Sequence, residues 1–354
     1  LAGIYYGAQY GGSTTAILVN LPGESSSVVT ALDGYQMARQ GRAGVALATA
    51  ALASFFAGCV ATIVIAIAAP ALSRMALLFG PPEFTALMVM GLIAAVVLAS
   101  GSIVASIGMV MVGMLLGLIG TDVTTGEQRF VFGIRQIYDG IDFVVIAMGL
   151  FGVAEIIANL ADRHARELPS GKITRLMPTK EDVIQAAPAT VRGTLLGSIL
   201  GVLPGGGALV SSFASYSLEK RLAKDPSRFG KGAIEGVAGP EAANNAGAQA
   251  SFIPMLALGI PPNAVMALMI AAMTIHGITP GPKFLTDQPT LFWGMVVSLW
   301  IGNMILVILN LPLVGIWVKL LKIPYAYLFP AILVFCCVGV YSINYRVFDV
   351  FLMA

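Results

Sequence analysis

Apolar residues run in long stretches along this chain, separated by shorter segments that are polar or rich in glycine and proline. A helix crossing a hydrocarbon core of about 30 Å needs roughly 20 apolar residues. Residues 44–72, 142–161 and about 291–318 meet that length, and another apolar run begins near residue 326. Residues 84–119 are too long for one crossing, and Ser100-Gly101-Ser102 divides them into two expected spans. The pattern predicts an all-α polytopic membrane protein.

Composition favours the same class. Of 354 residues, 57% are hydrophobic and 11% are charged, whereas soluble domains carry about 25% charged residues. This number of charged residues is too small to cover the surface of a soluble protein of this size. Lipid is therefore the expected outer solvent. The net charge of +2 gives no reason to expect a nucleic-acid partner. Cys59, Cys336 and Cys337 lie in apolar runs without a CxxC spacing, and we interpret them as packing residues.

Three segments interrupt the apolar pattern with proline and glycine: Pro22-Gly23, Pro204 to Gly207, and Pro261-Pro262. The second divides residues 188–218 into halves of about 14 residues, or roughly 20 Å of helix. Each half is too short to cross the bilayer, so a re-entrant hairpin is expected. Irregular backbone at membrane depth is tolerated where protein or water satisfies its polar groups. Such breaks can line a binding site, although each could also be a simple kink.

The stretch from Gly239 to Ser251 is polar where its neighbours are apolar. If it is helical, Glu241, Asn245 and Gln249 share one face, and Asn244, Ala248 and Ser251 form a second, small row beside it. Pro261-Pro262 is expected to end or kink this helix.

Lysine and arginine set the expected orientation. Loops 162–186 and 219–231 each hold five Lys or Arg residues, which favours the cytoplasmic side. Residues 33–42 are expected to form a polar loop on that side, and residues 277–290 to lie outside. Residues 1–38 and 232–276 then cross in opposite directions.

Those two oppositely directed segments share a short signature. Gly7-Ala8-Gln9 and Gly247-Ala248-Gln249 are each followed by a proline 13 residues after the glutamine. This predicts inverted-topology repeats, as in secondary transporters whose site lies between broken helices. The expected organisation is the remainder of a first half (1–161), a cytoplasmic basic linker (162–187) and a second half (188–354). Apolar patterning at both ends predicts that the natural polypeptide continues beyond each.

The candidate substrate and ion site consists of hydroxyl, amide and glycine residues at the breaks and on the polar stretch: Ser13, Thr14, Thr15, Asn20, Gly23, Gly205, Gly206, Gly207, Asn244, Asn245, Gln249 and Ser251. Backbone N–H groups at helix starts suit an anion, and freed carbonyl and hydroxyl oxygens suit Na⁺. Interhelical hydrogen bonding is the alternative for each hydroxyl. Glu24 and Glu241 fit helix capping and ion coupling equally well. No cofactor is expected, with Na⁺ as a possible coupling ion.

No nucleotide-binding GxxxxGK[ST], HExxH or GxSxG motif occurs in the sequence. We therefore expect no enzyme. The alternatives left open are an intramembrane enzyme, for which Glu155, Glu241 and His276 are the candidates, and an ion channel without gradient coupling.

Several longer motifs carry a family resemblance: Tyr5 through Leu18 followed by Pro22-Gly23-Glu24, Phe229 through Asn245, and Ile275 through Pro282. Across the whole chain the sequence resembles the large membrane subunit of bacterial tripartite tricarboxylate transporters. The resemblance implies a multi-pass protein of the bacterial inner (cytoplasmic) membrane. It would import small organic anions, di- or tricarboxylates such as citrate, by symport with Na⁺ or H⁺. Its implied partners are a small four-span membrane subunit and a periplasmic solute-binding protein.

Overall fold

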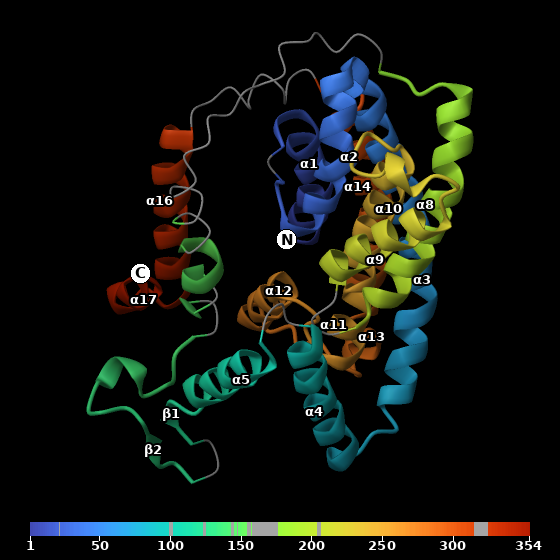
Figure 1. The fold of residues 1–354 in the computed structure, drawn as a ribbon. Coiled ribbons are helices and arrows are strands. Elements are labelled where there is room, and N and C mark those ends of the chain that lie inside the picture. The colour runs from blue at the N-terminus through green and yellow to red at the C-terminus, as the bar shows by residue number, and fades with distance from the viewer. Residues whose placement is uncertain are drawn as a thin grey trace. The chain divides into compact units, whose positions relative to one another are not determined.

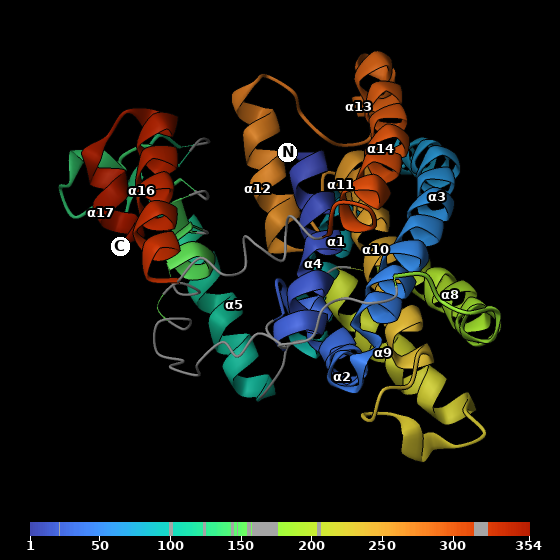
Figure 2. The ribbon, with the colours of Figure 1, turned by 90° about the horizontal axis from the view of Figure 1, so that it is seen from above.

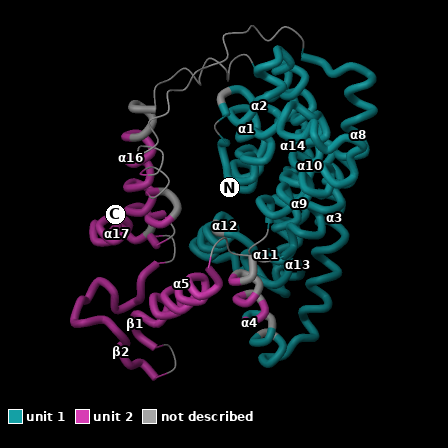
Figure 3. Tube along the Cα trace, viewed as in Figure 1, with its two compact units in different colours: residues 1–88, 166–320 teal, residues 89–165, 321–354 magenta. Residues whose placement is uncertain are grey.

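The computed structural model describes residues 1–20, 22–98, 102–122, 125–142, 145, 146, 148–153, 157, 176–203, 207–314 and 325–354. They form two compact units (Figures 1 and 3). Unit 1 contains residues 1–88 and 166–320, and unit 2 contains residues 89–165 and 321–354. The described chain is helical apart from loops and one two-stranded hairpin, as the all-α prediction required.

Unit 1 is a helical bundle. Its elements are α1 (Ala2–Val19), η1 (Ser25–Ser27), α2 (Val28–Met37), η2 (Ala38–Arg42), α3 (Ala43–Ala76), the first part of α4 (Pro81–Leu98), α8 (Lys180–Leu200), α9 (Gly207–Leu222), η5 (Pro226–Arg228), α10 (Glu235–Ala250), α11 (Phe252–Leu258), α12 (Ala264–Ile275), α13 (Phe284–Asp287) and α14 (Pro289–Asn310).

Unit 2 contains the rest of α4 and the remaining elements: α5 (Ile103–Gly117), β1 (Gly120–Thr121), β2 (Gln128–Arg129), η3 (Arg135–Ile137), η4 (Met148–Val153), α16 (Tyr325–Asn344) and α17 (Val347–Met353). The two strands pair antiparallel, with Gly120 opposite Arg129. A small apolar core joins Val145 to Cys336, Val340 and Met353.

Helix α10 is the centre of unit 1. All of its residues from Gly236 to Ala250 are buried. It packs on α3, α8 and α9, with α1 and α2 also in contact, and Figure 2 shows it between α1 and α3. The most polar helix of the bundle is therefore enclosed by protein. Its amide and carboxyl groups must find partners inside the bundle, because unpaired buried polar groups are costly.

Small residues bring α8 and α10 unusually close. Gly193 and Gly197 on α8 and Gly201 at its C-cap recur every fourth residue, and a Cβ added at any of them would overlap the backbone of α10. The opposing atoms belong to Gly239, Ala243 and Gly247, which have the same spacing. Small residues at four-residue spacing let two helix backbones approach closely, as is common between membrane helices.

The outer surface of the bundle is apolar. On α14, Phe292, Val296 and Leu299 are buried, whereas Val297, Ile301 and Met304 are more than half exposed. Three described helical stretches are long and apolar enough to cross a membrane: Ser25–Ala76, Lys180–Leu200 and Pro289–Asn310. Large apolar side chains on both sides of one helix are expected where lipid replaces water as the outer solvent.

The helices agree with most of the expected spans. Helix α3 covers residues 44–72, and residues 84–119 form two helices, α4 and α5. The expected span 142–161 lies largely outside the described residues. Helix α8 begins at Lys180, so the end of the expected basic linker is helical.

The expected polar loop at residues 33–42 is wrong. These residues continue α2 into η2 and then α3, with a kink at Gly41, whose φ of 78° suits glycine. Their polarity has another cause: Asp33 is fully buried and bonds to the backbone of another segment.

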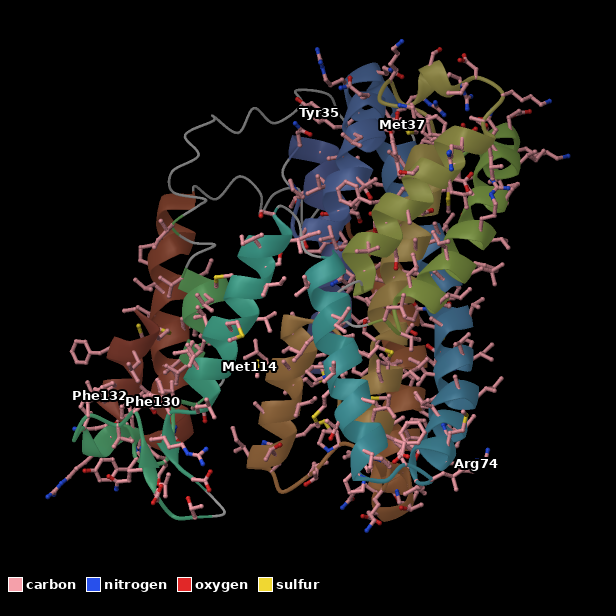
Figure 4. All side chains as sticks on the ribbon, turned by 60° about the horizontal axis from the view of Figure 1, so that its bottom comes forward. Tyr35, Met37, Arg74, Met114, Phe130 and Phe132 are labelled. Atoms are coloured by element: carbon pink, nitrogen blue, oxygen red, sulfur yellow. The ribbon has the colours of Figure 1, made fainter. Side chains whose placement is uncertain are left out.

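Several basic segments meet at one end of unit 1. Arg42 pairs with Asp182 at 2.5 Å, and the Gln40 amide donates to the carbonyl of Lys231 at 2.8 Å. Ser73 Oγ donates instead to the carbonyl of Pro282 at 2.6 Å, close to Arg74 at the far end of α3. Figure 4 shows Arg74 at one end of the bundle, and Tyr35 and Met37 toward the other. The segments that the charge pattern assigned to one side thus share one end.

Candidate functional site

The first break folds back onto α1. The helix ends at Asn20, whose φ of 55° is left-handed, and the N–H of Gly23 then donates to the carbonyl of Gly12 at 3.3 Å. A Cβ on Gly12 would overlap the carboxyl group of Glu24, and a Cβ on Gly23 would overlap the backbone of Gly12. Two glycines therefore allow Glu24 to lie directly against the first helix.

Four side chains meet at this break, and we call them the Ser26 cluster: Gln9, Glu24, Ser26 and Asn244. Ser26 Oγ lies 3.1 Å from Gln9 Oε1, 3.1 Å from Glu24 Oε1 and 2.9 Å from Asn244 Oδ1. Asn244 Nδ2 donates to Glu24 Oε1 at 2.9 Å. The cluster joins α1, the break and α10.

A second carboxylate lies about one turn away on α10. Glu241 is fully buried, and it accepts hydrogen bonds from Thr30 on α2 and, at 3.4 Å, from Ser54 on α3. Asn245 Nδ2 donates to Ser54 Oγ at 2.6 Å, while its Oδ1 is buried without a partner. Oxygen acceptors therefore predominate along this face of α10.

The next turn of the same face reaches Thr62 on α3. Thr62 Oγ1 donates to Gln249 Oε1 at 2.8 Å, and Gln249 Nε2 is buried without a partner. The predicted row of Glu241, Asn245 and Gln249 thus exists as a row, and it faces α3.

The break at the double proline has a different chemistry. Helix α11 ends at Gly259, whose φ of 72° is left-handed, and Asn263 caps α12 by accepting the N–H of Met266 at 3.0 Å. The amide nitrogen of Asn263 donates to the Tyr5 hydroxyl at 3.4 Å and to Ser251 Oγ at 3.5 Å. A Cβ built on Gly207, the first residue of α9, would lie 3.5 Å from that same nitrogen.

The N-termini of α9 and α12 therefore converge beside the double proline. Unsatisfied N–H groups and the helix dipole make such ends favourable to negative charge. The Tyr5 hydroxyl is a further donor, and the Asn263 amide holds it and Ser251 in place by donating to both. We call Tyr5, Gly207, Ser251 and Asn263 the Asn263 group.

The structure divides the predicted site residues between several places. Asn244 and Gly23 lie at the first break, and Gly207 and Ser251 belong to the Asn263 group. Gly205 and Gly206 are outside the described residues.

The remaining predicted residues on α1 have local or other partners. Ser13 and Thr15 donate to carbonyls of their own helix, those of Tyr10 and Gly12. Thr14 Oγ1 lies 3.5 Å from Asn310 Oδ1 on α14. Asn20 is exposed and caps α1.

Sequence reasoning missed three residues that hold these groups. Asp33 accepts the N–H groups of Gly232 and Ala233 at 2.7 and 2.8 Å, and so anchors the start of α10. Tyr5 and Asn263 were not in the candidate site. Asn263 could have been found, because an asparagine after a proline pair and before an apolar run is a helix-start signal.

A family model, described as the tripartite tricarboxylate transporter TctA family, matches residues 1–354. The chain belongs to that family. It is therefore a member of a family of membrane transporters that operate in systems with other subunits, and not of an enzyme family.

Two relatives come from Agrobacterium vitis. An uncharacterized 52.8 kDa protein from the TAR-I region is 62% identical over 351 residues, covering 99% of this chain and 70% of the relative. An uncharacterized protein from the TAR-II region is 65% identical over 155 residues, covering 44% of this chain and 64% of the relative. No solved structure matches the chain.

Proposed function

We propose that this protein is the large membrane subunit of a secondary carrier that imports small organic anions, di- or tricarboxylates such as citrate. A Na⁺ or H⁺ gradient drives the transport. A small four-span membrane subunit and a periplasmic solute-binding protein complete the system. The two membrane subunits lie in the bacterial inner membrane.

The convergence of the α9 and α12 N-termini at the Asn263 group carries this proposal. The group combines two positive helix ends with the Tyr5 hydroxyl and the Asn263 amide, and no carboxylate is among its members. A carboxylate substrate needs such donors, because no Lys, Arg or His lies in residues 13–20 or 244–251. The candidate site was spread over all three breaks, and the proposal assigns the anion to the space between Gly207 and the double proline.

The remaining polar residues of α10 supply the second half of a coupled mechanism. Asn244 and Glu241 lie on α10 about 10 Å or more from Ser251, since a helix rises 1.5 Å per residue. A cation held there would offset the charge of the substrate without sharing its binding site. A symporter requires that binding at the two sites be coupled, because both ions must be bound before the carrier changes state.

Uptake of radiolabelled citrate by the complete system in membrane vesicles tests the proposal. Asn263→Ala is expected to lower the initial uptake rate at subsaturating citrate by about tenfold, since a hydrogen bond to a charged group contributes roughly 1.5–3 kcal/mol. Asn344→Ala, an exposed asparagine in unit 2, is the matched control and should transport normally. Normal uptake by Asn263→Ala would remove the anion site from this break.

A variant on the first-break side of the bundle extends the test. Asn244→Ala should lose sodium dependence and retain its affinity for citrate, because Asn244 lies beside Glu24 and away from the Asn263 group. Counterflow in liposomes separates the carrier from a channel, since unlabelled substrate inside drives a transient accumulation of labelled substrate only through a carrier.

A further inference from the structure

The Ser26 cluster has more acceptor oxygens than protons to share among them. Ser26 carries one hydroxyl proton, yet three acceptor oxygens lie within 3.1 Å of its Oγ. It can donate to one of them at a time. Asn244 contributes one N–H to Glu24 Oε1. With the Gln9 and Asn244 amides turned oxygen-first toward Ser26, two of the three contacts of its Oγ have no proton between the oxygens. Close oxygens without a proton repel each other unless a positive charge lies among them.

Burial makes this deficit costly. The exposed fractions of Gln9, Ser26 and Asn244 are 6%, 2% and 0%. The second carboxyl oxygen of Glu24, Oε2, is fully buried and has no hydrogen-bond partner. Water therefore cannot supply the missing donors at that atom, and a buried charge without a partner is strongly unfavourable.

The charge of Glu24 is not balanced by an ion pair. The ion pairs found among the described residues of unit 1 join Arg42 to Asp182, Arg192 to Glu219 and Arg228 to Glu235. The other contacts of Glu24 are hydroxyl and amide groups and the backbone of Gly12. One carboxylate beside three neutral oxygens matches the charge of a monovalent cation.

We propose that the Ser26 cluster binds Na⁺, with Glu24, Ser26, Gln9 and Asn244 as its side-chain oxygen ligands. This rests on the proposed function, because it identifies the coupling ion and its site. With the Ser26 proton in one of the three contacts, a proton on Glu24 would fill a second and leave the third unfilled. A divalent cation would find only one carboxylate among these ligands, whereas such ions favour several.

Ion binding at this position has a structural consequence. The four ligands come from α1, from the break after it and from α10. An ion among them fixes the break against the central helix, about 10 Å along α10 from Ser251 at the proposed anion site. Sodium can therefore order the first break before the carboxylate arrives, which couples the two sites without direct contact between the ligands.

The test is equilibrium binding of ²²Na⁺ to the full chain in lipid nanodiscs, in choline chloride and without any carboxylate substrate. Saturable binding is expected for the native protein. Ser26→Ala should raise the dissociation constant at least about tenfold, because it removes one ligand to a charged group. Glu24→Gln should abolish saturable binding. Ser212→Ala is the matched control: its hydroxyl is equally buried and also contacts α10, at the carbonyl of Pro240, but lies outside the cluster.

Three results would overturn the proposal: no saturable ²²Na⁺ binding to the native protein, native affinity in Ser26→Ala, or equal losses in Ser26→Ala and Ser212→Ala. Thermal unfolding midpoints in choline chloride identify any variant that fails to fold, and Ser26→Ala still decides the matter if Glu24→Gln does so. The measurement contains no citrate. A wrong substrate assignment would therefore leave the sodium result unchanged, and a missing sodium site would leave the citrate result at Asn263 unchanged.

Discussion

Single buried side chains hold the polar centre of this protein together, and Asp33 is the clearest example. Its carboxylate lies against the turn that leads into α10. Oδ1 accepts the N–H groups of Gly232 and Ala233, just before the helix, and Oδ2 accepts the Tyr216 hydroxyl at 2.9 Å. A negative group at a helix start is also favoured by the helix dipole. The position of the central helix therefore depends on one residue of α2.

Replacing Asp33 should destabilise the protein in a graded way. Asp33→Ala leaves two buried N–H groups and a hydroxyl without their acceptor, so the free energy of unfolding should fall by about 2–4 kcal/mol. Asp33→Asn keeps an acceptor oxygen and should cost clearly less. Thermal unfolding of the purified protein in detergent measures both.

Asp225→Ala is the control for that series. Its exposed carboxylate accepts from the hydroxyl and the N–H of Ser227, which lower the pKa of Asp225 below its usual range. Loss of this surface turn should leave the unfolding midpoint nearly unchanged. Equal effects of Asp33→Ala and Asp225→Ala would contradict the anchoring role of Asp33.

At the scale of elements, the contact between α8 and α10 depends on small residues on both helices. The three glycines of α8 face the backbone of α10 at Gly239, Ala243 and Gly247. Glycine is normally unfavourable within a helix, so its repeated use here reflects close packing. The opposite faces of α10 remain free for the polar contacts with α3 and with the first break.

Two glycine-to-alanine substitutions should change the free energy of unfolding in opposite directions. Gly197→Ala places a methyl group against the carbonyl of Ala243, so the helices must separate and stability should fall by about 1–3 kcal/mol. Gly294→Ala lies on the exposed side of α14, where an added Cβ meets nothing within 4 Å. It should raise stability by about 0.5–1 kcal/mol. A stabilising Gly197→Ala in thermal unfolding would show that the helices are not in close contact.

At the scale of the molecule, unit 1 has two chemically different ends. One end gathers Arg42 with Asp182, and Arg228 with Glu235, beside Lys231. The other holds the Ser73 to Pro282 contact near Lys283. An excess of Lys and Arg marks the cytoplasmic side of membrane proteins, so the Arg42 end is expected to face the cytoplasm.

Cysteine labelling tests that orientation. Ser227→Cys and Thr286→Cys introduce exposed thiols at the two ends. In cells with a permeabilised outer membrane, a membrane-impermeant maleimide should label Thr286→Cys directly. It should label Ser227→Cys only after the inner membrane is opened. The unmodified chain, with Cys59, Cys336 and Cys337, is the blank, and the reverse labelling order would invert the topology.

The hydrophobic pattern by itself determined the membrane class, the positions of α3, α4, α5 and α14, and the presence of breaks at Pro22-Gly23 and at Pro261-Pro262. These features follow from local rules, since apolar length sets a span and proline or glycine ends a helix. Helical periodicity also placed Glu241, Asn245 and Gln249 in one row. It could not show that the row faces α3. Helical periodicity tells which residues share a face of the helix, but not which other helix packs against that face.

Only the tertiary structure decided which polar residues meet. Gln9 and Asn244 are 235 positions apart in the chain, yet each places an amide oxygen about 3 Å from Ser26 Oγ. Asp33 was expected in a loop because charge alone suggests exposure. It is instead a buried anchor, because it accepts the N–H groups of the two residues at the turn before α10. Side-chain partners across a helical bundle are set by packing between distant segments, and no local pattern along the chain contains that information.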